Sequence, residues 1–143
     1  MAMDDSLRAS ISLEGQGRLT IGLVRVSGGF VTLDIALEAG RSKLIRAFEL
    51  PSSSFIKFVQ ELAVMYRDLS GEALLGDYFC ESRIRLALVN RAKGAIELSG
   101  RFDGEHGTID HALRAEFDHL QTDQSALPKF IQALEAFPIS STQ

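Results

Sequence analysis

Strict alternation of apolar and polar residues over the first fifty positions is the feature that most constrains the fold of this chain. From Leu7 to Glu14 every second residue is apolar, and a similar period recurs in residues 18–26, 31–38 and 43–50. A period of two buries one face of an extended strand. The linking segments "GQG", "SGG" and "EAGRS" contain glycine, which is typical of tight turns. This part of the chain therefore predicts four strands.

At Pro51 the period changes to that of a helix. From Phe55 to Leu69, apolar residues recur at helical spacing along one face. Pro51 and the serines at 52–54 suit a helix N-terminus, where unpaired N–H groups are satisfied by side-chain oxygens. Gly71 suits the end of this helix.

In the second half of the chain, segments with the strand period of two are again followed by a segment with helical spacing. The predicted elements are strands within 72–79, at 83–90, at 95–102 and from Ile109 to Phe117, and a final helix with Leu127, Phe130, Ile131 and Leu134 on one face. The alternation slips before Leu120, which predicts a β-bulge near Asp118–His119. Pro128 is expected in the first turn of the helix, because deeper it would remove a helix hydrogen bond.

Short identities accompany this repeated order. The stretches "KFVQ" and "KFIQ" begin at Lys57 and Lys129, and a shift of 65 residues (84 minus 19) places Leu19–Gly29 over Ile84–Gly94. Two readings stay open: an internal duplication, or the common apolar pattern of any antiparallel meander followed by a helix.

Both readings predict the same α+β architecture. We expect a largely antiparallel β-sheet of about eight strands with two amphipathic helices on one face, in the order ββββα-ββββα. At 143 residues the chain is the size of one domain. We assign residues 1–143 to it, with pseudo-halves at about 6–70 and 71–137 and a flexible tail at 138–143. Whether the strands form one curved sheet or two packed halves is left open.

Composition points to the cytoplasm. No apolar run approaches the roughly 20 residues of a membrane helix. The N-terminus has acidic residues where a signal peptide has basic ones. A lone cysteine, Cys80, cannot form an internal disulfide, which suits a reducing compartment.

Charge is spread unevenly. The formal net charge is −4, yet residues 97–123 alone carry seven acidic residues against Arg101 and Arg114, a balance of −5. One interpretation is a negative surface that attracts a basic partner. The acidic residues predicted to bind this partner are Asp103, Glu105, Asp110, Glu116 and Asp118. The other interpretation is a solvated face whose acidic residues pair across strands with Arg83, Arg85 or Arg101.

Signals for catalysis and for ligand binding are weak. Asp110 and His111 are neighbours on a predicted strand and point to opposite faces, so no metal site and no cofactor are predicted. Cys80 lacks a recognisable partner base, and we expect no enzyme activity. Binding to nucleic acid is not expected, because the basic residues of 83–93 lie beside the acidic segment. A membrane partner is not expected either.

Two stretches resemble a known family. "LAVMYRDLSGEA" at 62–73 has a helix ending in a Tyr-x-x-Leu-x-Gly-Glu pattern, and "FDHLQTDQSALPKFIQALEAF" at 117–137 leads a strand through Thr-Asp-Gln-Ser into a helix. They are similar to the small bacterial immunity proteins of the WapI-like group and to uncharacterised bacterial proteins of the same layout. The similarity spans about residues 48–137.

The resemblance implies an immunity protein, or antitoxin, that neutralises a cognate bacterial toxin domain, often a nuclease, by direct binding and without catalysis. It carries over no catalytic residue. An alternative from another class is a small-molecule binding module with an apolar pocket between sheet and helices. A third is an enzyme that uses Cys80 or the loop from His106 to His111. The identity of the partner and the oligomeric state are left open.

Overall fold

The predicted order of elements is confirmed. In a computed structural model, which describes residues 7–104 and 114–140, the chain follows the order ββββα-ββββα. The elements are β1 (Arg8–Leu13), β2 (Gly17–Ser27), β3 (Phe30–Ala39), β4 (Ser42–Pro51), α1 (Ser52–Asp68), β5 (Glu72–Gly76), β6 (Arg83–Asn90), β7 (Ala95–Asp103), β8 (Arg114–Asp123), a 3₁₀ turn (Gln124–Ala126) and α2 (Leu127–Glu135).

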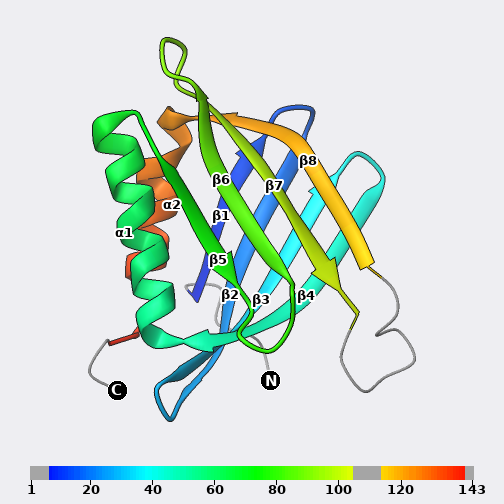
Figure 1. Cartoon of the computed structure of the whole chain (residues 1–143), viewed down its shortest axis with the longest axis vertical. Coiled ribbons are helices and arrows are strands. Elements are labelled where there is room, and N and C mark those ends of the chain that lie inside the picture. Colours follow the sequence, from blue (N-terminus) through cyan, green and yellow to red (C-terminus); the bar gives the residue numbers. More distant parts are fainter. Residues whose placement is uncertain (1–6, 105–113, 141–143) are drawn as a thin grey trace.

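The strands form two antiparallel sheets of four, each in sequence order. In Figure 1 the second sheet, β5–β8, crosses in front of the first sheet, β1–β4, and the two helices stand together along one side of the pair. The sheets approach each other at β1 and β8, where Glu14 N–H donates to the carbonyl of Gln121 at 2.7 Å. The strands therefore form two packed sheets and not one curved sheet.

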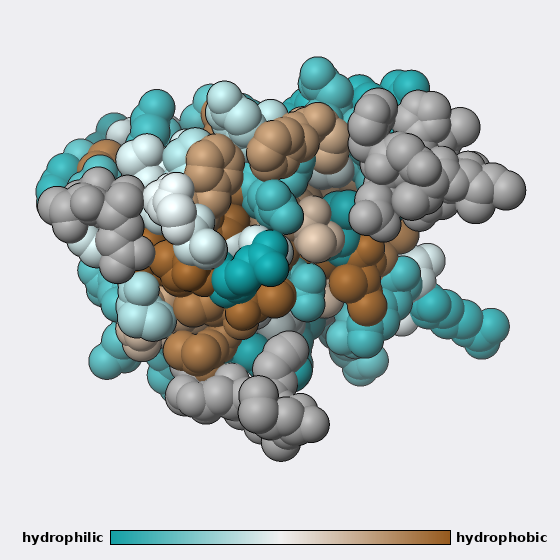
Figure 2. Space-filling view, turned by 90° about the horizontal axis from the view of Figure 1, so that it is seen from below, coloured by the Kyte–Doolittle hydropathy of each residue, from teal (hydrophilic) through white to brown (hydrophobic). Residues whose placement is uncertain are grey.

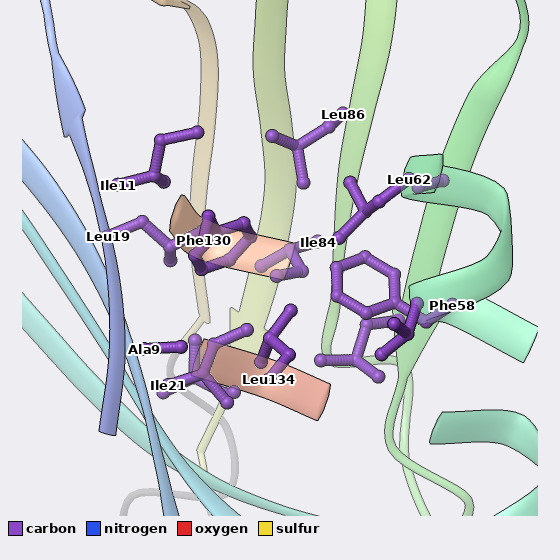
Figure 3. Packing of buried hydrophobic residues seen from close by; sticks show 14 of the residues in the cluster. Ala9, Ile11, Leu19, Ile21, Phe58, Leu62, Ile84, Leu86, Phe130 and Leu134 are labelled. Carbon is purple, nitrogen blue, oxygen red and sulfur yellow. The ribbon is translucent and has the colours of Figure 1, made fainter. Parts of the chain in front are cut away.

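One hydrophobic core joins both sheets and both helices. Alternate residues of the strands face inward, and both helices turn their apolar faces toward them. Figure 3 shows Phe58 and Leu62 of α1 facing Ile84 of β6, with Phe130 and Leu134 of α2 lying between the two sheets. These five side chains are fully buried. They lie between the sheets and the helices, and a hollow of about 490 Å³ lies between α1, α2 and the segment that follows α2.

The repeat extends to irregular features of the strands. Val24 is an extra residue between the pairs Leu23–Leu33 and Arg25–Thr32, so β2 bulges there. The equivalent bulge occurs in β6 at Val89, which is 65 positions later (89 minus 24). The two valines are also almost equally exposed, at 52% and 53%.

The hairpin turns that follow these bulges each end in a glycine. Gly29 and Gly94, again 65 positions apart (94 minus 29), have φ angles of 83° and 64°. Such positive angles favour glycine over residues with a Cβ. The two halves therefore share a left-handed glycine at the end of this turn, although two residues link β2 to β3 and four link β6 to β7.

The ends of α1 differ from expectation. Pro51 occupies the N-cap position as predicted, but no side-chain oxygen caps the helix, and the Ser52 hydroxyl is buried without a hydrogen-bond partner. The N-cap residue is Pro51, whose side chain has no oxygen that could accept a hydrogen bond from the first N–H groups of the helix. At the other end Leu69, not Gly71, adopts the left-handed cap conformation, with a φ angle of 51°. Pro128 lies in the first turn of α2, as expected.

Candidate partner-binding surface

The outer face of the second sheet carries rows of charged side chains, because its inward positions are taken by the core. In β7, Ile96 and Leu98 face inward and are fully buried, so the alternating residues between them point to solvent. The register places Arg83 of β6 opposite Arg101 of β7, and Arg101 opposite Glu116 of β8. We call Arg83, Arg85, Arg101, Glu116 and Asp118 the charged face.

A shallow hollow lies in the middle of the charged face, with a volume of about 350 Å³. Its lining residues are Arg83, Arg85, Ser99, Gly100, Arg101, Glu116, Phe117 and Asp118. The hollow thus presents three guanidinium groups, two carboxylates and a hydroxyl to solvent. Charges of both signs on one surface are arranged to pair with complementary charges on another surface.

The arginines of β6 are held by acidic residues at the margins of the face. Arg85 Nε lies 2.5 Å from Glu72 Oε2, and Arg83 lies 3.7 Å from Glu81 Oε2. All four side chains are well exposed, and exposed pairs of this kind each contribute about 0–1 kcal/mol to stability. They therefore orient the arginines without contributing much to the fold.

Asp103, one of the predicted contact residues, faces inward to the neighbouring turn. Its carboxylate accepts hydrogen bonds from Arg101 Nε at 2.6 Å and from the Glu81 backbone N–H at 3.2 Å. The Asp103 N–H donates to the buried Ser82 hydroxyl at 2.9 Å, and the side chain is only 15% exposed. The hydrogen bond from Arg101 lowers the pKa of the Asp103 carboxyl. Asp103 thus ties β7 to the turn between β5 and β6.

The predicted bulge in β8 is present and turns Asp118 outward. Leu98 pairs with Leu120 and Gly100 pairs with Phe117, so two residues of β8, Asp118 and His119, stand opposite one residue of β7. His119 has a φ angle of 59°, in the left-handed region. A bulge of this kind re-aims side chains and is common beside functional sites. Here it leaves the Asp118 side chain 71% exposed at the margin of the hollow.

His119 links the bulge to β7. Its Nδ1 lies 3.1 Å from Glu97 Oε2, and its Nε2 lies 3.6 Å from Asp118 Oδ2. The hydrogen bond to Glu97 and the charge of Asp118 raise the pKa of His119. Protonation of His119 therefore adds a positive charge beside Asp118 and strengthens the contact with Glu97.

The five predicted contact residues have different outcomes. Glu116 and Asp118 lie together on the charged face and are exposed. Asp103 is close by but is used within the fold. Glu105 and Asp110 lie outside the described residues. From the sequence, Arg83, Arg85 and Arg101 were expected only as partners that pair with the acidic residues. Their alternation with apolar residues along β6 and β7 indicates that they line one surface.

The residues of the alternative enzyme hypothesis lie only partly within the described part of the chain. Cys80 is half-buried, with its Sγ 3.2 Å from the Ser82 hydroxyl. Within residues 7–104 and 114–140, no three histidine, cysteine or acidic side chains are grouped to hold a metal ion. His106 and His111 lie outside this part of the chain. None of the described helices is long and apolar enough to cross a membrane.

Comparison with known proteins adds no relative: no protein-family model, no curated protein and no solved structure matches this chain.

Proposed function

We propose that this chain is a non-catalytic binding protein, an immunity protein or antitoxin that neutralises a bacterial toxin domain by direct contact. The observation that carries the proposal is the β-bulge at Asp118–His119. It interrupts an otherwise regular ladder, holds a non-glycine residue in a left-handed conformation and turns a carboxylate out beside a hollow. Strain of this kind, about 1–3 kcal/mol per residue, often marks a functional site.

The charges of the face indicate how a partner binds. Glu116 and Asp118 offer carboxylates to basic groups of the toxin domain, while Arg83 and Arg85 on the far side of the hollow repel a basic surface that is misaligned. Attraction and repulsion on one surface give a single orientation. The resemblance of residues 62–73 and 117–137 to WapI-like immunity proteins supports the same class of function.

The proposal is tested with the protein encoded next to this chain in its genome. If the upstream gene encodes a long secreted protein, its C-terminal domain is expressed alone and together with this chain. We expect the domain to arrest growth when alone, growth to be restored by coexpression, and the two polypeptides to copurify. Growth arrest that persists despite folded, soluble chain at equal abundance would contradict the proposal.

A salt series on the purified pair then tests the electrostatic contribution. The association rate should fall as sodium chloride rises from about 50 mM to about 500 mM, because the Debye length shortens from more than ~10 Å to less than ~5 Å. An association rate that is independent of salt would show that the charged face does not guide the encounter.

A further inference from the structure

Three of the four edge strands of the two sheets are covered. An uncovered edge can pair with a further strand, because its outward N–H and C=O groups have no partner. The edges are β1 and β4 in the first sheet and β5 and β8 in the second. β1 and β8 approach each other, where the Glu14 N–H donates to the Gln121 carbonyl at 2.7 Å. β5 lies against α1, where the Leu74 N–H donates to Glu61 Oε1 at 3.2 Å. The remaining edge is β4.

The turn between β5 and β6 covers one end of β4. The Tyr78 N–H donates to the Glu49 carbonyl at 2.7 Å, and the Glu49 N–H donates to Asp77 Oδ1 at 2.6 Å. The turn carries the exposed rings of Tyr78 and Phe79. It lies at the lower end of the molecule in Figure 1, and Figure 2, seen from below, shows hydrophobic residues across the centre of this end. The edge of β4 is therefore closed at Glu49.

The bonds of Glu49 also show which main-chain groups of β4 point outward. Both its N–H and its C=O point away from β3, and this direction alternates along an antiparallel strand. The β3–β4 register has no bulge, so the N–H and C=O groups of Lys43, Ile45 and Ala47 point away from β3 as well. Among residues 7–104 and 114–140, none forms a hydrogen bond with these outward groups. We call residues 43–47 the open edge.

The open edge is complementary to itself. When β4 of a second copy lies antiparallel about a twofold axis at Ile45, Ile45 faces Ile45 and Lys43 faces Ala47 of the other copy. Each of these pairs exchanges two main-chain hydrogen bonds. The central pair brings together two side chains that are each 59% exposed in the single chain. A lysine often keeps edges apart, but Lys43 stands opposite a small apolar residue here, and its Nζ lies 3.9 Å from Glu38 Oε1 of its own chain.

The length of the open edge also fits a second copy. β4 begins at Ser42, and the same register places Ser42 opposite Phe48 of the other copy. The added strand therefore ends one residue short of Glu49, where the turn between β5 and β6 already occupies the edge. A longer strand from another protein would have to displace this turn.

We propose that the open edge pairs with the open edge of a second copy of this chain, so that the first sheets of the two copies form one continuous antiparallel sheet in a symmetric dimer. This inference goes beyond the proposed function and does not rest on it, because the charged face belongs to the second sheet. Pairing over five residues gives a small interface, so we expect a dissociation constant of about 10 μM to 1 mM.

Hydrogen exchange on the full chain tests the backbone pairing. Amide exchange of the ¹⁵N-labelled protein is followed by NMR at about 20 μM and at about 2 mM. The outward amides of Lys43, Ile45 and Ala47 should exchange at least about twofold more slowly at the higher concentration, because the dimer gives each of them an acceptor. Exchange of these amides that is independent of concentration would overturn the inference.

Sedimentation equilibrium on matched variants tests where the copies meet. The unsubstituted chain should shift from monomer toward dimer between about 10 μM and about 1 mM. Ile45→Lys places two lysines face to face on the axis and should stay monomeric throughout. Val24→Lys, the matched control, changes an exposed apolar residue of β2 that is 52% exposed and lies away from the open edge, so it should dimerise like the unsubstituted chain.

Urea unfolding confirms that both lysine variants are folded. A monomer at every concentration of the unsubstituted chain would overturn the inference. A dimer that persists in Ile45→Lys would also overturn it, because the copies would then meet at another surface.

Discussion

Two aspartates of the second sheet show how environment decides the role of a residue. Asp103 accepts hydrogen bonds from Arg101 and from the turn between β5 and β6, whereas Asp118 stands out from a bulge into solvent. The sequence places both in one acidic segment. Only the fold distinguishes the carboxylate that ties the turn to β7 from the one that is available to a partner.

Because the two aspartates have different surroundings, replacing each carboxylate by an amide should lower the free energy of unfolding by different amounts. Asp103→Asn should lower the free energy of unfolding by about 1–3 kcal/mol, because charged hydrogen bonds to a mostly buried group are lost. Asp118→Asn, the matched control, should change it by less than about 0.5 kcal/mol. Urea unfolding at neutral pH measures both variants. Equal stabilities of the two variants would show that Asp103 has no structural role.

Gly100 makes room for two neighbours at once. A Cβ at this position would lie 2.3 Å from the Arg83 carbonyl oxygen and 2.8 Å from the ring of Phe117. Gly100→Ala should therefore destabilise the fold by about 1–3 kcal/mol. In β5 of the same sheet, Gly76→Ala places its nearest contacts at 3.8 Å and should be close to neutral. Thermal unfolding compares the two, and similar melting temperatures would contradict the packing described for Gly100.

His119 should make stability depend on pH. Glu97 and Asp118 raise its pKa in the folded state above the unfolded value of about 6.5. The protonated imidazole therefore stabilises the fold fully below about pH 6.5, and this contribution is lost as pH rises through the raised pKa. His119→Asn keeps a residue type that tolerates the left-handed conformation but removes the titration.

The difference in urea midpoint between the unsubstituted chain and His119→Asn should be larger at about pH 5.5 than at about pH 8.5. The reverse order, or a constant difference, would show that Glu97 and Asp118 do not favour the imidazolium. A direct NMR titration of the imidazole gives the same information without unfolding.

At the scale of elements, periodicity predicted most of the fold. Period two located the described strands, and the phase slip before Leu120 located the β8 bulge, because a bulge shifts every later side chain to the other face. The ends of α1 could not be predicted as well. Ser52 is a good N-cap residue by type, but the helix begins one residue earlier, with Pro51 at the N-cap, and Leu69 rather than a glycine takes the left-handed position.

The charged face was only partly predictable, because its geometry also depends on contacts between distant parts of the chain. The alternation of Arg83, Arg85 and Arg101 with apolar residues indicates one solvent-facing surface, but the pairing register that brings Arg101 beside Glu116 depends on the β8 bulge. The exposure of Tyr78 and Phe79 depends on the docking of one sheet's turn onto the other sheet. No local pattern carries such information about contacts far apart in the chain.

The helix sequences "KFVQ" and "KFIQ" provide an element-scale prediction. Phe58 and Phe130 occupy equivalent positions, and each is fully buried in the common core. Phe58→Ala and Phe130→Ala should each cost about 3–5 kcal/mol. Exposed Tyr66 of α1 serves as the control, and Tyr66→Ala should cost much less. Circular dichroism during urea unfolding measures these losses; a small loss for either phenylalanine would contradict its place in the core.

At the scale of the whole molecule, two similar halves form one unit. Each sheet buries only one face, and that face is covered by the other sheet and the helices. The outer faces are consequently left for solvent and for partners. The first sheet exposes Val24 and Ile45 among its outward residues, whereas the second combines a bulge with a left-handed histidine, a charged hollow and a hydrogen-bonded aromatic turn. The second sheet is therefore the side on which we expect a partner.

The affinity of a charge-reversed variant for the toxin domain tests this claim most directly. Glu116→Lys/Asp118→Lys is compared with Asp34→Lys/Glu38→Lys, which makes the same change of charge on the outer face of the first sheet. Unfolding curves confirm that both variants are folded, and isothermal titration calorimetry measures dissociation constants. We predict that reversal on the second sheet weakens binding at least about a hundredfold, since close charge pairs couple by about 1.5–7 kcal/mol. Reversal on the first sheet should change affinity less than about threefold. Equal effects of the two variants, or unchanged affinity after reversal of Glu116 and Asp118, would contradict the assignment of the charged face as the binding surface.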